Sequence, residues 1–180
     1  MGSEAQENKK LTMEEKLTEK VRKIEIKQKR IDKFYLNIAE LFASRSHCLS
    51  VQVGAVCVRD DRIIATGING TPSGNKNCDE IFDVLKWEEH KVYHHDWSSL
   101  HEIHAEMNVI LYAARHGIKL DGATLYSNIE PCIQCTKNLM QSGIVRIVYS
   151  KEYYRNKDNV ALVKFIKEND HKIKFECIHE

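Results

Sequence analysis

Apolar and polar residues follow two spacings along this chain, and the spacings predict the order of its helices and strands. Apolar steps of three and four predict helices over residues 31–45, from residue 104, from residue 131 to Gly143 and over residues 158–168. Short apolar runs predict five strands, at residues 53–58, 62–68, 123–127, 144–149 and 172–177. Asp60-Asp61 closes a hairpin between the first two strands, residues 69–77 form a loop, and an irregular stretch precedes His104.

This order of elements predicts an α/β fold, a three-layer α/β/α sandwich around a mixed five-stranded sheet. The helix between the last two strands favours placing them parallel, because a tight turn cannot make that crossover. A chain of 180 residues suits one domain with an extension. We therefore expect one α/β domain over residues 31–180, preceded by a charged helical arm or extension over residues 1–30.

The arm carries apolar residues at heptad-like steps, among them Leu17, Val21 and Ile24. One interpretation is a helix that pairs with a neighbouring subunit. The default interpretation is a frayed amphipathic helix, because so few heptads are weak support for a coiled coil.

Charge and composition narrow the class of function. The formal charge of +1 gives no broad basic surface of the kind that follows a phosphate backbone, so no nucleic-acid partner is expected. No apolar run approaches the roughly 20 residues that span a bilayer, which predicts no membrane partner and a cytoplasmic location. Six cysteines without a leader indicate metal ligands and buried thiols rather than disulfides.

The chemistry of the chain is concentrated in an H-x-E … P-C-x-x-C pattern. His104, Cys132 and Cys135 are one imidazole and two thiols, which suit zinc, and Glu106 is a carboxylate that is not an obvious ligand. Three protein ligands leave a fourth position for water, and Glu106 is placed to move that water's protons. The pattern is the general signature of zinc nucleobase deaminases.

Each half of this pattern alone has an ordinary interpretation. A C-x-x-C pair can be a redox motif or half of a zinc ribbon, and H-x-E on a helix is commonly a surface pair; their combination is far more specific. We expect His104 to open one helix and Pro131 to lie in the first turn of another, with Cys132 and Cys135 on one face. The two helix N-termini would then favour thiolates at the metal.

Several segments together resemble the deoxycytidylate (dCMP) deaminases of the cytidine/deoxycytidylate deaminase superfamily, over about residues 33 to 178. They are V-G-A-V at 53–56, G-I-N-G-T-P-S-G at 67–74, H-H-D-W-S-S-L-H-E-I-H-A-E-M-N at 94–108, D-G-A-T-L-Y at 121–126 and E-P-C-I-Q-C at 130–135. The stretch W-S-S-x-x-E-I-H-A-E is similar to bacteriophage and viral members in particular. If the protein is viral, the expected location is the cytoplasm of the host cell.

The resemblance implies hydrolysis of dCMP to dUMP and ammonia, which supplies thymidylate synthesis. Zinc on His104, Cys132 and Cys135 would activate the water that attacks C4 of cytosine, and Glu106 would carry its proton to N3 and assist the departing amine. By resemblance the substrate-binding residues are Asn69, Ala105, Ser127 and Asn128, with Tyr153 and Arg155 near the phosphate and Lys157 as a further cation.

Phage members of the family also carry a second, structural zinc. Cys48, Cys78, His94 and Glu102 match its ligand positions, although His90, His95 and His101 are equally available by composition. Many members are homohexamers activated by dCTP with Mg²⁺ and inhibited by dTTP. The regions that match effector binding and its interface contain Gly70, Asn75 and Arg115.

Three functions remain open from the sequence. The first is a dCMP deaminase, which in a few viral relatives also accepts dCTP. The second is a deaminase of cytosine, cytidine or a tRNA base, which needs no phosphate contacts such as Tyr153 and Arg155. The third is a zinc-stabilised scaffold without activity, which Glu106 argues against because a structural site has no use for that carboxylate.

Overall fold

The computed structural model describes residues 12–153 and 160–179. The chain divides into two compact units between Ile31 and Asp32, and helix α1 (Met13–Ala43) contributes to both. In the first unit the described residues 13–31 are helical, and their apolar side chains, such as Leu17 and Ile24, are exposed. No helix of the described chain is long and apolar enough to cross a membrane.

The second unit is built on one five-stranded sheet with the order β2-β1-β3-β4-β5. The strands are β1 (Gly54–Arg59), β2 (Arg62–Ile68), β3 (Thr124–Ile129), β4 (Arg146–Lys151) and β5 (Lys174–Cys177). Strand β1 is antiparallel to β2 and β3, whereas β3, β4 and β5 are mutually parallel. The predicted mixed sheet and its parallel last pair are confirmed.

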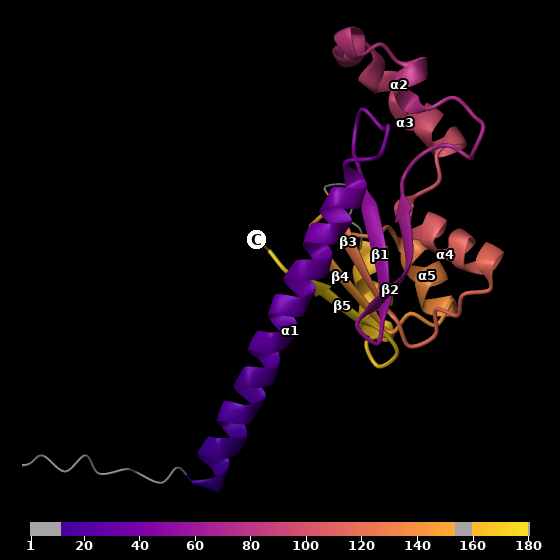
Figure 1. Cartoon of the computed structure of the whole chain (residues 1–180). Coiled ribbons are helices and arrows are strands. Elements are labelled where there is room, and N and C mark those ends of the chain that lie inside the picture. Colours follow the sequence, from indigo (N-terminus) through magenta and orange to yellow (C-terminus); the bar gives the residue numbers. More distant parts are fainter. Residues whose placement is uncertain (1–11, 154–159, 180) are drawn as a thin grey trace, which may run out of the picture. The chain divides into compact units, whose positions relative to one another are not determined.

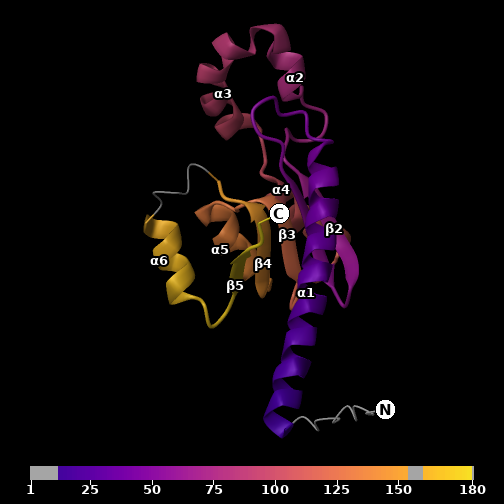
Figure 2. The same ribbon diagram turned by 90° about the vertical axis from the view of Figure 1, so that its left-hand side faces the viewer.

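Helices cover both faces of this sheet. Figures 1 and 2 show α4 (Ala105–His116), α5 (Ile133–Gln141) and α6 (Val160–Glu168) on one face. The part of α1 after Asp32 lies on the other face, where Tyr35 packs on Tyr126 of β3 with ring centroids 5.1 Å apart. The predicted three-layer α/β/α sandwich is therefore confirmed.

The prediction of an irregular stretch before His104 is wrong. It contains α2 (Cys78–Ile81), the 3-10 turn η1 (Val84–Lys86) and the long helix α3 (Trp87–His101). Helix α3 exposes Val92, Tyr93 and Leu100 and buries His94, so no apolar face marked it in the sequence. Both views show α2 and α3 together beyond the end of the sheet where β1 begins (Figures 1 and 2).

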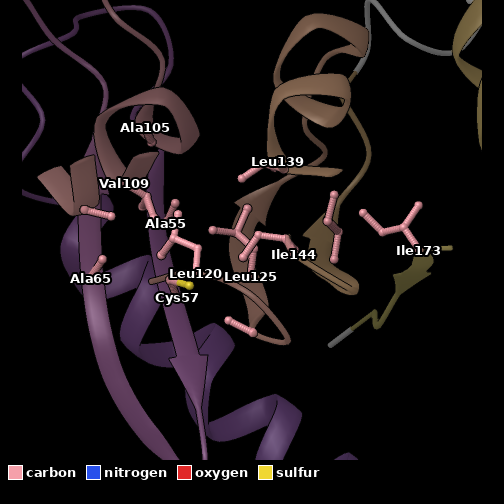
Figure 3. Close-up of a cluster of buried hydrophobic side chains, with 13 residues drawn as sticks. Ala55, Cys57, Ala65, Ala105, Val109, Leu120, Leu125, Leu139, Ile144 and Ile173 are labelled. Atoms are coloured by element: carbon pink, nitrogen blue, oxygen red, sulfur yellow. The ribbon is translucent and has the colours of Figure 1, made fainter. Parts of the chain in front are cut away.

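The main core lies between the sheet and the helices α4 and α5 (Figure 3). Leu125, Ile147, Leu139 and Val109 are fully buried there, and Cys57 of β1 is a buried small residue, as expected. The layer is thin near β2, because a Cβ atom on Gly67 would lie 2.1 Å from the carbonyl oxygen of Ala105. Glycine at this position allows the start of α4 to approach the sheet closely.

A buried ion pair fastens α1 to the other face of the sheet. Asp32 is 1% exposed, and both of its carboxylate oxygens accept hydrogen bonds from the Arg146 guanidinium, at 2.6 and 2.8 Å. The Tyr126 hydroxyl donates a third, at 2.8 Å. The same guanidinium also forms an ion pair with Glu176, whose side chain is 44% exposed. Removing one partner of a buried pair leaves an uncompensated charge.

We predict that Asp32→Asn lowers the free energy of unfolding by about 3 kcal/mol, because Arg146 then keeps no charged partner on its buried side. Glu176→Gln is the matched control, with an expected loss below about 1 kcal/mol, because that carboxylate is exposed. Urea denaturation of both variants measures the difference. Equal losses in the two variants would contradict the prediction.

Candidate metal and catalytic site

His104, Cys132 and Cys135 come together at the N-termini of α4 and α5. His104 is the N-cap of α4 and Cys132 is the N-cap of α5, with Cys135 in the first turn that follows. The His104 Nδ1 lies 3.6 Å from Cys132 Sγ and 3.5 Å from Cys135 Sγ. A tetrahedral zinc ion with ordinary bond lengths holds an imidazole nitrogen and a thiolate sulfur about 3.6 Å apart. The three donors therefore fit such an ion.

The start of α5 differs by one or two residues from the sequence prediction. Pro131 precedes the N-cap and is not in the first turn, because the helix begins at Ile133. The Cys132 Sγ accepts a hydrogen bond from the Cys135 backbone N–H at 3.5 Å and so caps the helix. One thiol thus caps the helix and the other lies in its first turn, where the helix dipole favours negative charge.

The protonation of these groups is coupled. The hydrogen bond from the Cys135 thiol lowers the pKa of Cys132 to about 4, and the same bond raises the pKa of Cys135. The hydrogen bond to Cys132 likewise raises the pKa of His104. The Cys132 sulfur therefore ionises more readily than that of Cys135, and a metal ion bound by both sulfurs would release the remaining thiol proton.

Glu106 lies beside this group and is not a member of it. It is the second residue of α4 and is 4% exposed. Burial raises the pKa of its carboxyl group. A buried carboxyl next to a metal site, with a pKa moved toward neutrality, is suited to accept and return a proton.

A second group of donors lies where α2 and α3 meet the loop before β1. It contains Cys48, Cys78, His94 and Glu102, whose ligand atoms all lie within 4.8 Å of one another. The distance from Cys48 Sγ to His94 Nε2 is 3.5 Å, again close to the spacing of ligands on zinc.

Two observations show that this second group also fits a metal ion. The Glu102 Oε1 atom is buried and accepts no hydrogen bond from the described residues. Burial raises the pKa of Cys78 to about 12 and also raises the pKa values of Cys48 and Glu102. Thiols and a carboxyl gathered out of water are costly to ionise unless a cation compensates them.

Membership of the donor group distinguishes His94 from the other histidines of this region. Its ring is enclosed by Phe82, Trp87 and Trp97, with centroids 5.6, 5.2 and 6.1 Å away. His90, His95 and His101, the alternatives by composition, belong to no such donor group among the described residues.

One cavity of about 350 Å³ touches both groups. It opens beyond the carboxyl ends of β2, β3 and β4, a common location for ligands in α/β folds. Its volume lies in the range of small-molecule pockets. The lining residues come from six segments: Cys48, Ser50, Val51, Val53, Asn69, His94, His95, Ser98, Ser99, Glu102, His104, Ala105, Glu106, Ile129, Glu130, Cys132 and Tyr153.

The structure separates the predicted substrate-binding residues into two sets. Asn69, Ala105 and Tyr153 line the cavity. The Asn69 side chain also holds the cavity wall, because its Oδ1 accepts from Val53 N at 2.8 Å and its Nδ2 donates to Val51 O at 2.9 Å.

Ser127 and Asn128 do not line the cavity as described. The Asn128 side chain joins β3 to the start of β1, accepting from Gly54 N at 2.9 Å and donating to Gln52 O at 3.1 Å. Arg155 and Lys157 lie outside the described residues.

The predicted effector residues do not line the cavity. Gly70 forms an isolated bridge with Ile103, which ties the loop after β2 to the residue before His104. Asn75 lies in the same exposed loop, and Arg115 is exposed in the last turn of α4.

The sequence prediction missed several cavity residues, among them the polar residues His95, Ser98 and Ser99 of α3 and Glu130 after β3. The available signal was their spacing, since positions 95, 98 and 99 share one face of a helix. That signal required the helix to be recognised first.

The family comparison now identifies this arrangement. A family model described as "Cytidine and deoxycytidylate deaminase zinc-binding region" matches residues 29–151, more than half of the chain. The chain belongs to the cytidine and deoxycytidylate deaminase family. It is therefore a hydrolytic deaminase, and the match includes both donor groups.

Individual relatives agree with this assignment. The chain is 39% identical over 151 residues to a deoxycytidylate deaminase of Enterobacteria phage T2, covering 68% of this chain and 80% of that protein. The T4 phage protein of the same name is 35% identical over 81% of this chain and 95% of its own length. A solved dCMP deaminase from cyanophage S-TIM5, in complex with dCMP and dUMP, matches with a TM-score of 0.65 and 30% identity, over 83% and 97% of the chains.

We predict two bound zinc ions per purified chain, one for each donor group. Cys48→Ser and Cys132→Ser should each remove one ion, because each removes a thiolate ligand from a different group. Elemental analysis by mass spectrometry measures the count. Cys177→Ser is the control, since this half-buried cysteine belongs to neither group. A Cys48→Ser protein that keeps both ions would contradict the second site.

Proposed function

We propose that this protein catalyses the zinc-dependent hydrolysis of dCMP to dUMP and ammonia. The observation that carries the proposal is the position of Glu106, a buried carboxyl that lines the cavity beside the His104, Cys132 and Cys135 donors but outside their group. The names of the phage relatives and of the dCMP- and dUMP-containing cyanophage structure support the choice of substrate.

The chain would contribute to the reaction through positions and protons. His104, Cys132 and Cys135 would hold the zinc, which when bound makes a water molecule nucleophilic at neutral pH. Glu106 would accept a proton from that water and deliver it to N3 of cytosine as the oxygen adds to C4. It would then assist protonation of the amine, so that the C4–N bond breaks and ammonia leaves.

The remaining cavity residues would hold the nucleotide. Asn69 and the backbone of Ala105 would contact the sugar and the base, and Tyr153 the phosphate. Ser127 and Asn128 would support the cavity wall through hydrogen bonds between their side chains and the main chain of β3 and the start of β1. Arg155 remains a predicted phosphate contact.

A second zinc on Cys48, Cys78, His94 and Glu102 would be structural. Four protein donors from separate segments are typical of a closed site, which leaves no position for a reacting water. Such an ion would join α2 and α3 to the loop before β1, and so hold one wall of the cavity.

The resemblance to the dCMP deaminases supports a proposal on regulation and assembly. We propose a homohexamer activated by dCTP with Mg²⁺ and inhibited by dTTP, with Gly70, Asn75 and Arg115 in the effector region. The enzyme would supply dUMP for thymidylate synthesis in the cytoplasm, with residues 31–180 as the deaminase domain. Residues 1–30, of which 1–11 lie outside the described residues, would form a charged helical arm or extension.

We predict that Glu106→Gln lowers kcat for dCMP by about 10³-fold, within the usual range for loss of a general acid–base group, while zinc content stays unchanged. Ammonia release measures activity. Glu89→Gln is the control, because Glu89 is exposed on α3 and does not line the cavity.

The same assay tests the competing functions when dCMP, dCTP, CMP and deoxycytidine are each supplied with and without dCTP or dTTP as effector. Turnover of dCTP would extend the substrate range. If zinc-loaded protein leaves dCMP unchanged under every effector, the proposed function is wrong. Activity on deoxycytidine, or on nothing, would then favour the nucleoside deaminase or the scaffold.

A further inference from the structure

One wall of the cavity is a single polar face of helix α3. His95, Ser98 and Ser99 all line the cavity, and their spacing of three and four places them on the same side of the helix. Glu102, one turn further along at the C-cap, lines it as well. Each of the first three side chains can donate a hydrogen bond.

The two serine hydroxyls lie close to His95. Ser98 Oγ donates to the His95 carbonyl oxygen at 3.1 Å, and Ser99 Oγ donates to the same oxygen at 2.7 Å. A hydroxyl rotates about its C–O bond and can redirect its proton to a stronger, anionic acceptor. The imidazole and the two hydroxyls therefore offer hydrogen-bond donors on one wall of the cavity.

The other walls of the cavity suit an anion poorly. Glu106 lies at the first donor group, and Glu130 accepts a hydrogen bond from the Tyr153 backbone N–H at 3.3 Å. The described lining residues include no lysine or arginine. A phosphate placed beside Glu130 would meet like charge, whereas His95, about two turns before the Glu102 carboxyl on α3, offers a donor.

The α3 face is also well fixed. His94, one residue before His95, is buried in the second donor group, and Glu102 belongs to that group too. A metal ion held by this group would attach both ends of the polar face to the loop that carries Cys48. A binding group on a helix held at two points keeps its position relative to Glu106.

We propose that His95, together with Ser98 and Ser99, binds the 5′-phosphate of the nucleotide and makes the enzyme prefer a nucleoside monophosphate over the nucleoside. This inference rests on the proposed function and adds a specificity-determining residue to it. It places the main phosphate donors on α3, and Tyr153 then contributes from a different segment.

The test compares kcat/KM for dCMP and for deoxycytidine in the zinc-loaded wild type and in His95→Ala. We expect roughly a tenfold to hundredfold loss for dCMP, the usual effect of removing a hydrogen bond to a charged group, and less than about a twofold change for deoxycytidine. His95→Gln, which keeps an N–H donor, should recover part of the loss. Lys91→Ala is the control, because this exposed cation of α3 does not line the cavity.

A second readout does not depend on turnover. Calorimetric binding of dUMP should weaken in His95→Ala and, to a smaller extent, in Ser99→Ala, while deoxyuridine binding stays constant. Should His95→Ala not fold, Ser99→Ala and His95→Gln decide the question by the same two ratios.

The outcomes separate this inference from the proposed function. A wild type that does not deaminate dCMP overturns the proposed function. A wild type that deaminates dCMP, with a His95→Ala variant that loses both substrates equally or neither, overturns only the role of His95. Equal loss accompanied by loss of one zinc ion would show that His95 acts through its neighbour His94.

Discussion

The close packing of α4 against β1 and β2 is the constraint on which the site depends. The backbone of α4 lies so near the sheet that a Cβ atom on Gly67 would overlap the Ala105 carbonyl. This approach places the first turn of α4 at the carboxyl edge of the sheet. Strand β3 ends at the same edge, and α5 begins a few residues later. His104 and Cys132, each the N-cap of its helix, meet there as a consequence.

The Cys132 side chain both caps α5 and provides a readily ionised sulfur for a metal. Backbone N–H groups at a helix start lack partners within the helix, and Cys132 satisfies one of them through its sulfur. The hydrogen bond from Cys135 lowers the pKa of the same sulfur to about 4. This shift favours the thiolate form, which a metal ligand needs. Glu106 has the opposite environment, because burial raises the pKa of its carboxyl group. Adjacent groups therefore differ in role through their surroundings.

A metal ion on the second donor group would give α2 and α3 a stability that their composition does not. Helix α3 exposes most of its large apolar residues, and its buried side is a histidine among aromatic rings. A small segment with little apolar burial is ordinarily weak, and metal ligands are a common substitute for a larger core. The segment that carries one cavity wall would thus be ordered mainly by ligands and ring contacts.

The sequence alone determined the elements whose periodicity is simple and the chemistry whose spacing is local. The alternating strands, the parallel last pair and the H-x-E … P-C-x-x-C pattern were predictable because each depends on residues near one another in the chain. The resemblance supplied the candidate second donor group, but the residues themselves left four histidines equivalent. Only tertiary structure distinguishes His94, by placing its Nε2 atom 3.5 Å from Cys48 Sγ within one donor group.

Tertiary structure also decided which polar residues face the cavity. Asn69 and Asn128 are both asparagines that were predicted to bind the substrate, but only Asn69 lines the cavity. The Asn128 side chain instead forms hydrogen bonds with the main chain at Gly54 and Gln52. Helix α3 was missed because its pattern lacks an apolar stripe, and with it the shared face of His95 and Ser99. Side-chain direction depends on packing between distant segments, which periodicity within one segment does not encode.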